Sequence, residues 1–485
     1  MRHAHRFPSL SMLLALVGLA ACGEDGQSPT APSEAGGPAF TQIPGRVVVN
    51  SLADPGDGIC DATQCTLREA IKATGSTRIS FKSGLTGTIT LARPGAGGGT
   101  LVIDKSLAIT GPDVRVVIQR RSTDPAFRIV RIAGRDTVRL TNLILRKGAD
   151  TTGGGIINFG HLALTNCTVT GNSALRFGGG IDNHGWLSVT DSRVANNSEE
   201  GIFSDGNLML NRSVVTGNSG GGIFSRGQLT LASSVVSDNN GSGISIFGFT
   251  FRDISTVITN STISGNSTEG DGGAIANDGG ARLTIIKSTL EGNSADAGGA
   301  IFTRQGLRDD RGVVIIRNST ISGNAARFGG AIYGSQDGAD DDAVAGIYNS
   351  TITRNSASEG GGIHLEGGLV VSLRNTIVAQ NRAVTGPDLF GPGTDALFSL
   401  IGDGSTSELI DGVGGTRVGT TKAPIDPKLA PLADYGGPTR THQLLLGSPA
   451  IDAASSADCA ITDQRGVQRP QGAACDIGSF ERAVR

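Results

Sequence analysis

The residues IIRNSTISGNAARFGGAIYG, from Ile315 to Gly334, recur with variations through the middle of this 485-residue chain. Each copy has a glycine-led run, a run of alternating apolar residues and a β-branched run, and the changes in length fall between these runs. A repeat of this size indicates an architecture of stacked structural units, one for each copy. One equivalent Asn per copy, at spacings of 21 to 31 residues, stands at Asn172, Asn197, Asn218, Asn239, Asn266, Asn293, Asn324, Asn355 and Asn381.

The three runs of each copy predict three β-strands. Apolar residues such as Leu162 and Leu164 fall at every second position, and no period of 3.6 residues persists across a copy. The signatures of leucine-rich and propeller repeats are missing from the sequence. The expected fold class is therefore all-β, with residues 77–402 forming a right-handed parallel β-helix of three strands per coil.

Recurring Asn residues are expected at the corners between strands, where Asn and Gly tolerate backbone angles that β-branched residues do not. At one corner, stacking is predicted to join the side-chain amides in a ladder. Asp191, Arg212, Ser233 and Lys287 interrupt this ladder. Its predicted members are Asn142, Asn166, Asn260, Asn318, Asn349 and Asn375.

The glycine-led strands can be aligned position by position, which predicts one inward row and two outward rows. Because adjacent strands lie about 4.8 Å apart, Asp205 can pair with Arg226 and Phe203 can stack on Phe224. The inward row is Ile156, Ile181, Ile202, Ile223, Ile244, Ile275, Ile301, Ile332 and Ile363. The outward rows include Asp182, Phe203, Phe224, Phe302, Tyr333 and His364, and then His184, Asp205, Arg226 and Arg304.

An outward stripe of aromatic rings edged by charges is typical of a saccharide-binding surface. Its predicted binding residues are Phe203, Phe224, Arg226, Phe302, Arg304 and Tyr333. The alternative is that long loops fold over this face, so that the rings form a second core. For catalysis, the closest arrangement to an acid and base pair is Asp182, His184 and Asp205. The residue series of the polygalacturonases and the Arg-x-Pro-x-x-Arg motif of the pectate lyases are missing.

The N-terminus predicts a lipoprotein signal peptide over residues 1–22. Basic residues precede an apolar run, and Leu19-Ala20-Ala21-Cys22 resembles a bacterial lipobox in which Cys22 is lipidated. An ordinary cleaved signal is the alternative. Residues 23–45, rich in Gly, Ser, Pro and Ala, predict a flexible tether. The expected location is the bacterial outer membrane, at the cell surface or on the periplasmic face.

Residues 46–76 predict an N-terminal cap. In an exported chain Cys60 and Cys65 favour a disulfide, and Thr66 with Glu69 forms a capping box at the start of a short helix. The run from Cys65 to Ala70, Cys-Thr-Leu-Arg-Glu-Ala, resembles the motif of the CSLREA family of bacterial surface proteins. That resemblance implies a pectin-lyase-like β-helix and an exported location, and it implies no activity.

Residues 403–485 predict a C-terminal cap in which Cys459 and Cys475 form a disulfide. The segments GGPTRTH, SPAIDAA, DQRG and DIGSFE resemble the C-terminal region of proteins with a choice-of-anchor family Q domain. Polar residues such as His442, Asp463 and Arg465 are expected to hold loop backbone there. In the coils, Cys167 is expected to be a buried thiol and Trp186 a core residue.

The formal charge of −3 and the pI near 6.1, with no cluster of basic residues, argue against nucleic acid as a partner. We expect a monomer without a cofactor. Asp340, Asp341 and Asp342 could bind Ca²⁺, although a solvated acidic loop is the favoured interpretation. The favoured function is a non-catalytic adhesion or glycan-binding module at the cell surface. The alternative is a lyase or glycoside hydrolase acting on an acidic polysaccharide.

Overall fold

A computed structural model describes residues 45–95, 97–248, 254–279, 281–305, 314–336, 344–367 and 369–483. Predictions for the signal peptide with Cys22, for the tether up to residue 44, and for Asp340, Asp341 and Asp342 lie outside these residues. Within them, no helix is long and apolar enough to cross a membrane.

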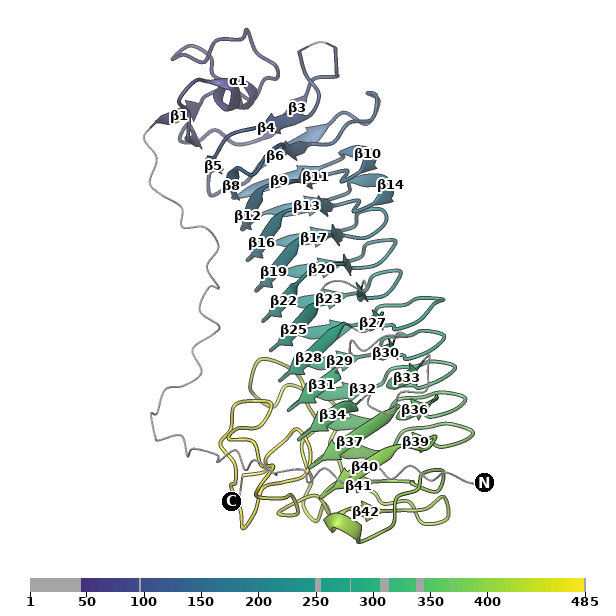
Figure 1. The fold of residues 1–485 in the computed structure, drawn as a ribbon. Coiled ribbons are helices and arrows are strands. Elements are labelled where there is room, and N and C mark those ends of the chain that lie inside the picture. The colour runs from purple at the N-terminus through teal and green to yellow at the C-terminus, as the bar shows by residue number, and fades with distance from the viewer. Residues whose placement is uncertain are drawn as a thin grey trace, which may run out of the picture. The chain divides into compact units, whose positions relative to one another are not determined.

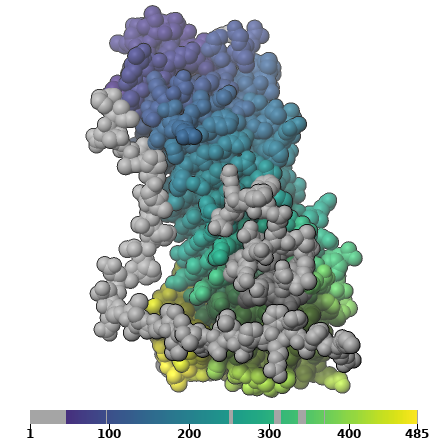
Figure 2. Space-filling view, viewed as in Figure 1, coloured from purple at the N-terminus to yellow at the C-terminus, as the bar shows by residue number. Residues whose placement is uncertain are grey.

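The described strands form three parallel sheets, and successive strands of the chain visit sheets C, A and B in turn (Figure 1). Each strand therefore pairs with the equivalent strand one coil before and one coil after it. The predicted parallel β-helix with three strands per coil is confirmed. Figure 2 shows the coils following one another in the order of the chain.

Sheet A contains β1 (Arg46–Val49), β2 (Arg78–Phe81), β5 (Leu107–Thr110), β8 (Thr137–Thr141), β12 (His161–Thr165), β16 (Trp186–Thr190), β19 (Asn207–Asn211), β22 (Leu229–Ala232), β25 (Ser255–Thr259), β28 (Arg282–Ile286), β31 (Val314–Arg317), β34 (Val344–Tyr348), β37 (Val370–Arg374) and β40 (Thr394–Leu397). Sheet B contains β3 (Thr88–Leu91), β6 (Val116–Arg120), β9 (Leu143–Arg146), β13 (Thr168–Thr170), β17 (Arg193–Ala195), β20 (Val214–Thr216), β23 (Val235–Ser237), β26 (Thr262–Ser264), β29 (Thr289–Glu291), β32 (Thr320–Ser322), β35 (Thr351–Thr353), β38 (Ile377–Ala379), β41 (Leu400–Ile401) and β42 (Arg417–Val418). Sheet C contains β4 (Leu101–Ile103), β7 (Val130–Ile132), β11 (Ile156–Asn158), β15 (Ile181–Asn183), β18 (Ile202–Ser204), β21 (Ile223–Ser225), β24 (Ile244–Phe247), β27 (Ile275–Asp278), β30 (Ile301–Gln305), β33 (Ile332–Gln336), β36 (Ile363–Leu365) and β39 (Leu389–Phe390).

Outside these sheets lie α1 (Leu67–Lys72), the paired strands β10 (Ala149–Thr152) and β14 (Ser173–Phe177), and the 3₁₀ turn η1 (Val413–Gly415). The predicted inward row of isoleucines is confirmed as core, because none of its nine side chains is more than 4 % exposed. In each strand the neighbours of these residues point the other way.

Helix α1 begins at the predicted capping box. The Glu69 amide donates to Oγ1 of Thr66 at 3.3 Å, and the Thr66 amide donates to Oε2 of Glu69 at 2.8 Å. Leu67 and Ile71 are buried in the main core, so the helix covers the first coil as expected. The Cys60–Cys65 disulfide is present, and β1, which falls inside the predicted cap, is itself a strand of sheet A.

The predicted corner residues adopt the left-handed backbone that their position requires. All six Asn residues have φ between 48° and 57°, and the four interrupting residues have φ between 47° and 49°. Their amides do not form one continuous ladder, because only Asn166 with Asn142 (2.8 Å) and Asn375 with Asn349 (3.4 Å) are bonded. Elsewhere the corner uses other contacts, such as the two-point bond between Arg212 and Asp191.

The long amide ladder lies instead in the buried row on which the repeat is aligned. From Asn172 to Asn381, each Nδ2 donates to Oδ1 of the next Asn at 2.8 to 3.0 Å. The ladder ends at Asp388, whose Oδ1 accepts from Asn381 at 2.8 Å. Burial raises the pKa of Asp388 to about 6, although bonds from Asn381 and Asp403 oppose this rise.

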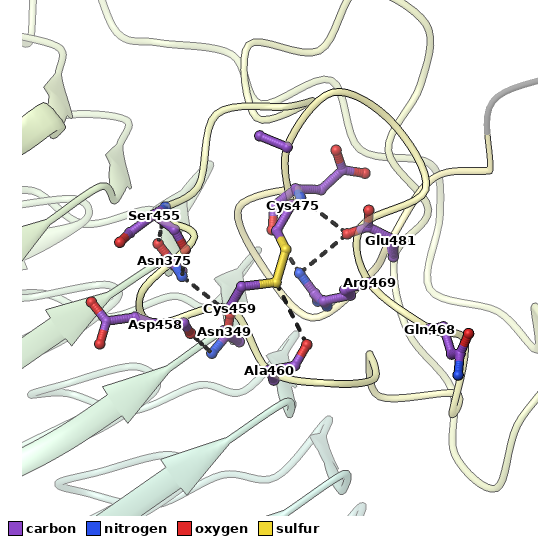
Figure 3. The surroundings of a disulfide bond; sticks show 12 residues. Asn349, Asn375, Ser455, Asp458, Cys459, Ala460, Gln468, Arg469, Cys475 and Glu481 are labelled. Atoms are coloured by element: carbon purple, nitrogen blue, oxygen red, sulfur yellow. Dashed lines mark hydrogen bonds and ion pairs between the residues drawn. A yellow bond between two sulfur atoms is a disulfide. The ribbon is translucent and has the colours of Figure 1, made fainter. Parts of the chain in front are cut away.

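The C-terminal residues 426–483 lie against the outer face of sheet B (Figure 1). Thr320 donates to Gln464 at 2.7 Å, and Oγ1 of Thr351 accepts from the Ser479 amide at 3.0 Å. The corner row also contacts this unit beside the disulfide (Figure 3). Nδ2 of Asn375 donates to the Ser455 carbonyl, and the Ser455 amide donates to Oδ1 of Asn375. This unit therefore packs along the side of several coils.

The predicted polar residues of the C-terminal unit bind backbone and one another. Arg465 pairs with Asp463 at 2.7 Å, and Nη1 of Arg469 donates to the Asp476 carbonyl at 2.7 Å. The Cys459–Cys475 disulfide is present among them (Figure 3). Cys167 is a buried free thiol, and it stands where later coils have the serines Ser192 and Ser213, whose hydroxyls accept from the backbone of the preceding coil.

Candidate functional site

Two outward rows on sheet C bring the predicted catalytic candidates together. In β15, Asp182 is 2 % exposed, and Nε2 of His184 lies 3.0 Å from its Oδ1. From the next coil, Oδ2 of Asp205 lies 3.4 Å from Nδ1 of the same ring. Parallel pairing of β15 with β18 produces this contact, because it sets equivalent positions of adjacent coils side by side.

Neighbouring charges and burial shift the pKa values of two groups at this site. The Asp182 carboxylate raises the pKa of His184 above its ordinary value of 6.5; burial opposes this effect and Asp205 adds to it. Burial also raises the pKa of Glu200, with a further contribution from the nearby Asp182 and Glu199. Nη1 of Arg226 lies 3.7 Å from Oδ1 of Asp205, so the predicted Asp205 and Arg226 pair is present.

The rings of the first outward row are stacked, and they are also covered. Phe203 and Phe224 lie 5.3 Å apart and nearly parallel, as predicted. Phe177 of β14 stacks on Phe203 at 4.7 Å, which leaves Phe203 only 2 % exposed. The Arg226 guanidinium lies over both Phe203 and Phe224. Phe203 is therefore closed to a ligand by β14, which agrees with the alternative that the rings form a second core and not with an open saccharide-binding ring.

The remaining predicted binding residues form a second group further along the coils. Phe302 is 6 % exposed and stacks on Tyr333, with ring centres 5.6 Å apart. Arg304 lies over Phe302 and bonds to both oxygens of Asp278 at 3.1 and 2.9 Å. The Tyr333 hydroxyl donates to Glu366 at 2.7 Å. The burial of Phe302, too, agrees with a second core and not with an open saccharide-binding ring.

An open cavity of about 530 Å³ lies beside His184, where each coil turns from sheet C into sheet A. We call it the C–A groove. It is lined by Arg135, Phe159, Gly160, His161, His184, Gly185, Trp186, Asp205, Gly206, Asn207, Gly227, Gln228 and Ile254. Of the predicted site residues, His184 and Asp205 reach it.

One wall of the C–A groove is formed by the first residues of successive strands of sheet A. Register places His161, Trp186 and Asn207 at equivalent positions of β12, β16 and β19, one coil apart. Phe159 also lines the groove, and its ring stacks on His184 at 5.2 Å, within 10° of parallel, with the Arg131 guanidinium over its face as well. Aromatic and polar side chains therefore line the groove together.

Glycines form the floor of the groove. A Cβ at Gly185 or Gly206 would collide with the carbonyl oxygen of the glycine in the coil before, so only glycine allows the turns to stack this closely. Asn183 supports the turn from inside, where its Nδ2 donates to the carbonyls of Gly185 and Asn207 at 3.2 Å each. The floor thus presents backbone to the cavity.

Sequence reasoning missed most of the groove. Trp186, expected in the core, lies half-buried on the outer edge of sheet A, and His161, Asn207 and Gln228 were not singled out. The one signal was their place, each directly after a glycine that repeats from coil to coil. Among the described residues, no group of His, Cys, Asp or Glu has the arrangement of a metal site.

Comparisons with known proteins give short or distant similarities. The model of the Chlamydia polymorphic membrane protein repeat matches residues 260–278. Among solved structures, the pectate lyase Pel9A aligns at 14% identity and a TM-score of 0.41, over 91% of this chain and 97% of that chain. No curated protein sequence matches this chain.

Proposed function

We propose that this protein is an exported, non-catalytic β-helical surface module that binds a saccharide in the C–A groove. The observation that carries the proposal is the place of the Trp186 ring beside polar side chains from His184, Asp205 and Asn207 around one open cavity. Sugar rings stack on aromatic faces while their hydroxyls bond to carboxylate and amide groups.

The location rests on two sequence features. The lipobox-like segment ending at Cys22 supports a lipid-anchored outer-membrane protein. The repeat that matches residues 260–278 takes its name from a membrane protein of Chlamydia. A stack of coils held on a tether would display the groove away from the lipid surface.

A second candidate function is cleavage of a polysaccharide, favoured by one observation. Asp182, His184 and Asp205 are in contact at the edge of the groove, and His184 has a raised pKa. A protonated ring beside an open cavity can act as a general acid. Binding and cleavage therefore require the same test.

The protein should be incubated with a panel of neutral and acidic polysaccharides, with both retention and the release of new chain ends measured. We expect binding without new ends. Trp186→Ala should weaken binding by about 1 to 3 kcal/mol, the range for a stacked ring, whereas Tyr348→Ala, an aromatic change elsewhere on sheet A, should not. New ends that disappear in Asp205→Asn would establish the enzyme instead.

A further inference from the structure

The ring of His184 lies between two carboxylates, one on each nitrogen. Its Nε2 is 3.0 Å from Asp182 and its Nδ1 is 3.4 Å from Asp205. Both contacts are ion pairs by distance, and Oδ1 of Asp182 is buried without a hydrogen-bonded partner. Two carboxylates this close to one ring favour its charged form, because each attracts the imidazolium. The arrangement therefore matches the imidazolium form.

The two carboxylates differ in their access to water. Asp182 is buried, with 2% of its side chain exposed, whereas the Asp205 side chain is 36% exposed and lines the C–A groove. A neutral ring keeps one N–H and turns a lone pair toward the other carboxylate. Because an uncompensated buried charge costs more than an exposed one, we expect the remaining N–H on Nε2, facing Asp182, while Asp205 keeps only its longer contact with Arg226.

Other charged groups lie near His184 and its two carboxylate neighbours. Arg226 reaches Asp205 only at 3.7 Å, and Glu200 interacts with Asp182. Phe159 stacks on the ring of His184 and has the Arg131 guanidinium over its face. Two more basic side chains, Arg135 and His161, line the groove nearby.

We propose that His184 is a proton-controlled positioning residue, which holds Asp205 in place for saccharide binding when the ring is charged and releases it when the ring is neutral. This inference rests on the proposed function and adds its regulation. The raised pKa of His184 agrees with this proposal. Asp182 is the main cause of the rise, burial of the ring opposes it, and Asp205 adds to it. Saccharide affinity should therefore be highest below the folded-state pKa and fall as the pH rises through it.

The first arm of the test uses Trp186, the single tryptophan of the chain, as the reporter of saccharide binding. Affinity measured by its fluorescence should fall about tenfold between about pH 5.5 and pH 8.5. His184→Gln should bind weakly at every pH, and His184→Arg, which stays charged and can donate to both carboxylates, should bind without the pH transition. His161→Gln should keep the transition, whatever its affinity. A transition that persists in His184→Gln would overturn the proposal.

The second arm needs no saccharide. Nuclear magnetic resonance of the unliganded protein should show the His184 ring and the Asp205 carboxyl carbon changing at one common pH, and Asp205→Asn should move the ring transition to lower pH. If no saccharide binds at any pH, the proposed function fails while this arm still decides the role of His184. An Asp205 carboxyl signal that does not change at the pH of the His184 transition would contradict the positioning role.

Discussion

Nδ2 of Asn381 donates to Oδ1 of Asp388 at 2.8 Å, and this contact ends the amide ladder that begins at Asn172. Every link has the same direction, from the amide nitrogen of one coil to the amide oxygen of the next. The same oxygens also accept from backbone amides, as Oδ1 of Asn266 does from Asn239 at 3.1 Å. Each ladder member therefore joins two coils by at least two bonds.

Replacing a central member of this ladder should destabilise the protein. Asn266→Ala leaves buried donors of Asn239 without their acceptor, and we expect the free energy of unfolding to fall by about 2 to 4 kcal/mol. Asn260→Gly is the matched control, because the Oδ1 of Asn260 has no partner and glycine accepts its φ of 50°. Denaturant unfolding should place the control within about 0.5 kcal/mol of the wild type.

Asp388 should make stability fall as the pH rises. Its folded pKa is about 6 and its ordinary value is 3.8, so the folded state holds the proton more tightly. Asp388 contributes its full stabilisation below about pH 4, and this contribution is lost as the pH rises toward 6. The loss in free energy of unfolding is up to about 3 kcal/mol, at about 1.4 kcal/mol for each unit of pKa difference. Unfolding measured over this window should show the loss in wild type and not in Asp388→Asn. Parallel curves would contradict the account.

The Cys459–Cys475 disulfide should hold the C-terminal unit, whereas Cys167 should stay unreactive. Burial raises the pKa of Cys167 to about 11, so the folded protein should not be alkylated there at neutral pH. Cys459→Ala with Cys475→Ala should cost about 3 kcal/mol on the chain-entropy model. Mass mapping of the alkylated protein checks the cysteine pairing and the unreactive thiol, and denaturant unfolding checks the stability loss. A bridge that includes Cys167 would be inconsistent with its place in the core.

Lipid anchoring predicts that Cys22→Ser releases the protein from membranes. On this proposal Cys22 is the acylated residue, so the variant lacks the acyl chains that would hold it at the membrane. Fractionation with and without an acyl label is the measurement. The proposal fails if the variant remains in the membrane fraction and the wild type takes up no label.

Sequence was sufficient where position along a coil decides the outcome. Period-two alternation predicts the buried row that includes Ile181 and Ile202, and strand stacking predicts the contact of Asp205 with Arg226. The corner backbone followed from Asn and Gly preferences. These features depend on neighbours one or two residues away, or one coil away at the same position.

The remaining features depend on burial that the repeat does not encode. Phe177 covers Phe203 from a segment between the regular runs, whose path the alternation leaves open. The corner row is interrupted by four other residues, and its member Asn349 donates to the Asp458 carbonyl instead of to another amide. The continuous ladder is the row that includes Asn266, where each coil supplies an Asn. Trp186 was assigned to the core by residue type, although its place at the start of β16 points it outward.

The most direct test of the account is a fluorescence titration of Trp186 with the polysaccharide panel, run beside calorimetry on the same samples. Because Trp186 is the single tryptophan and lines the C–A groove, its emission reports on this groove. The account predicts a saturable change in emission with the same affinity as the calorimetric one, weakened in Asn207→Ala. Calorimetric binding with no change in Trp186 emission, or no binding by either method, would contradict it.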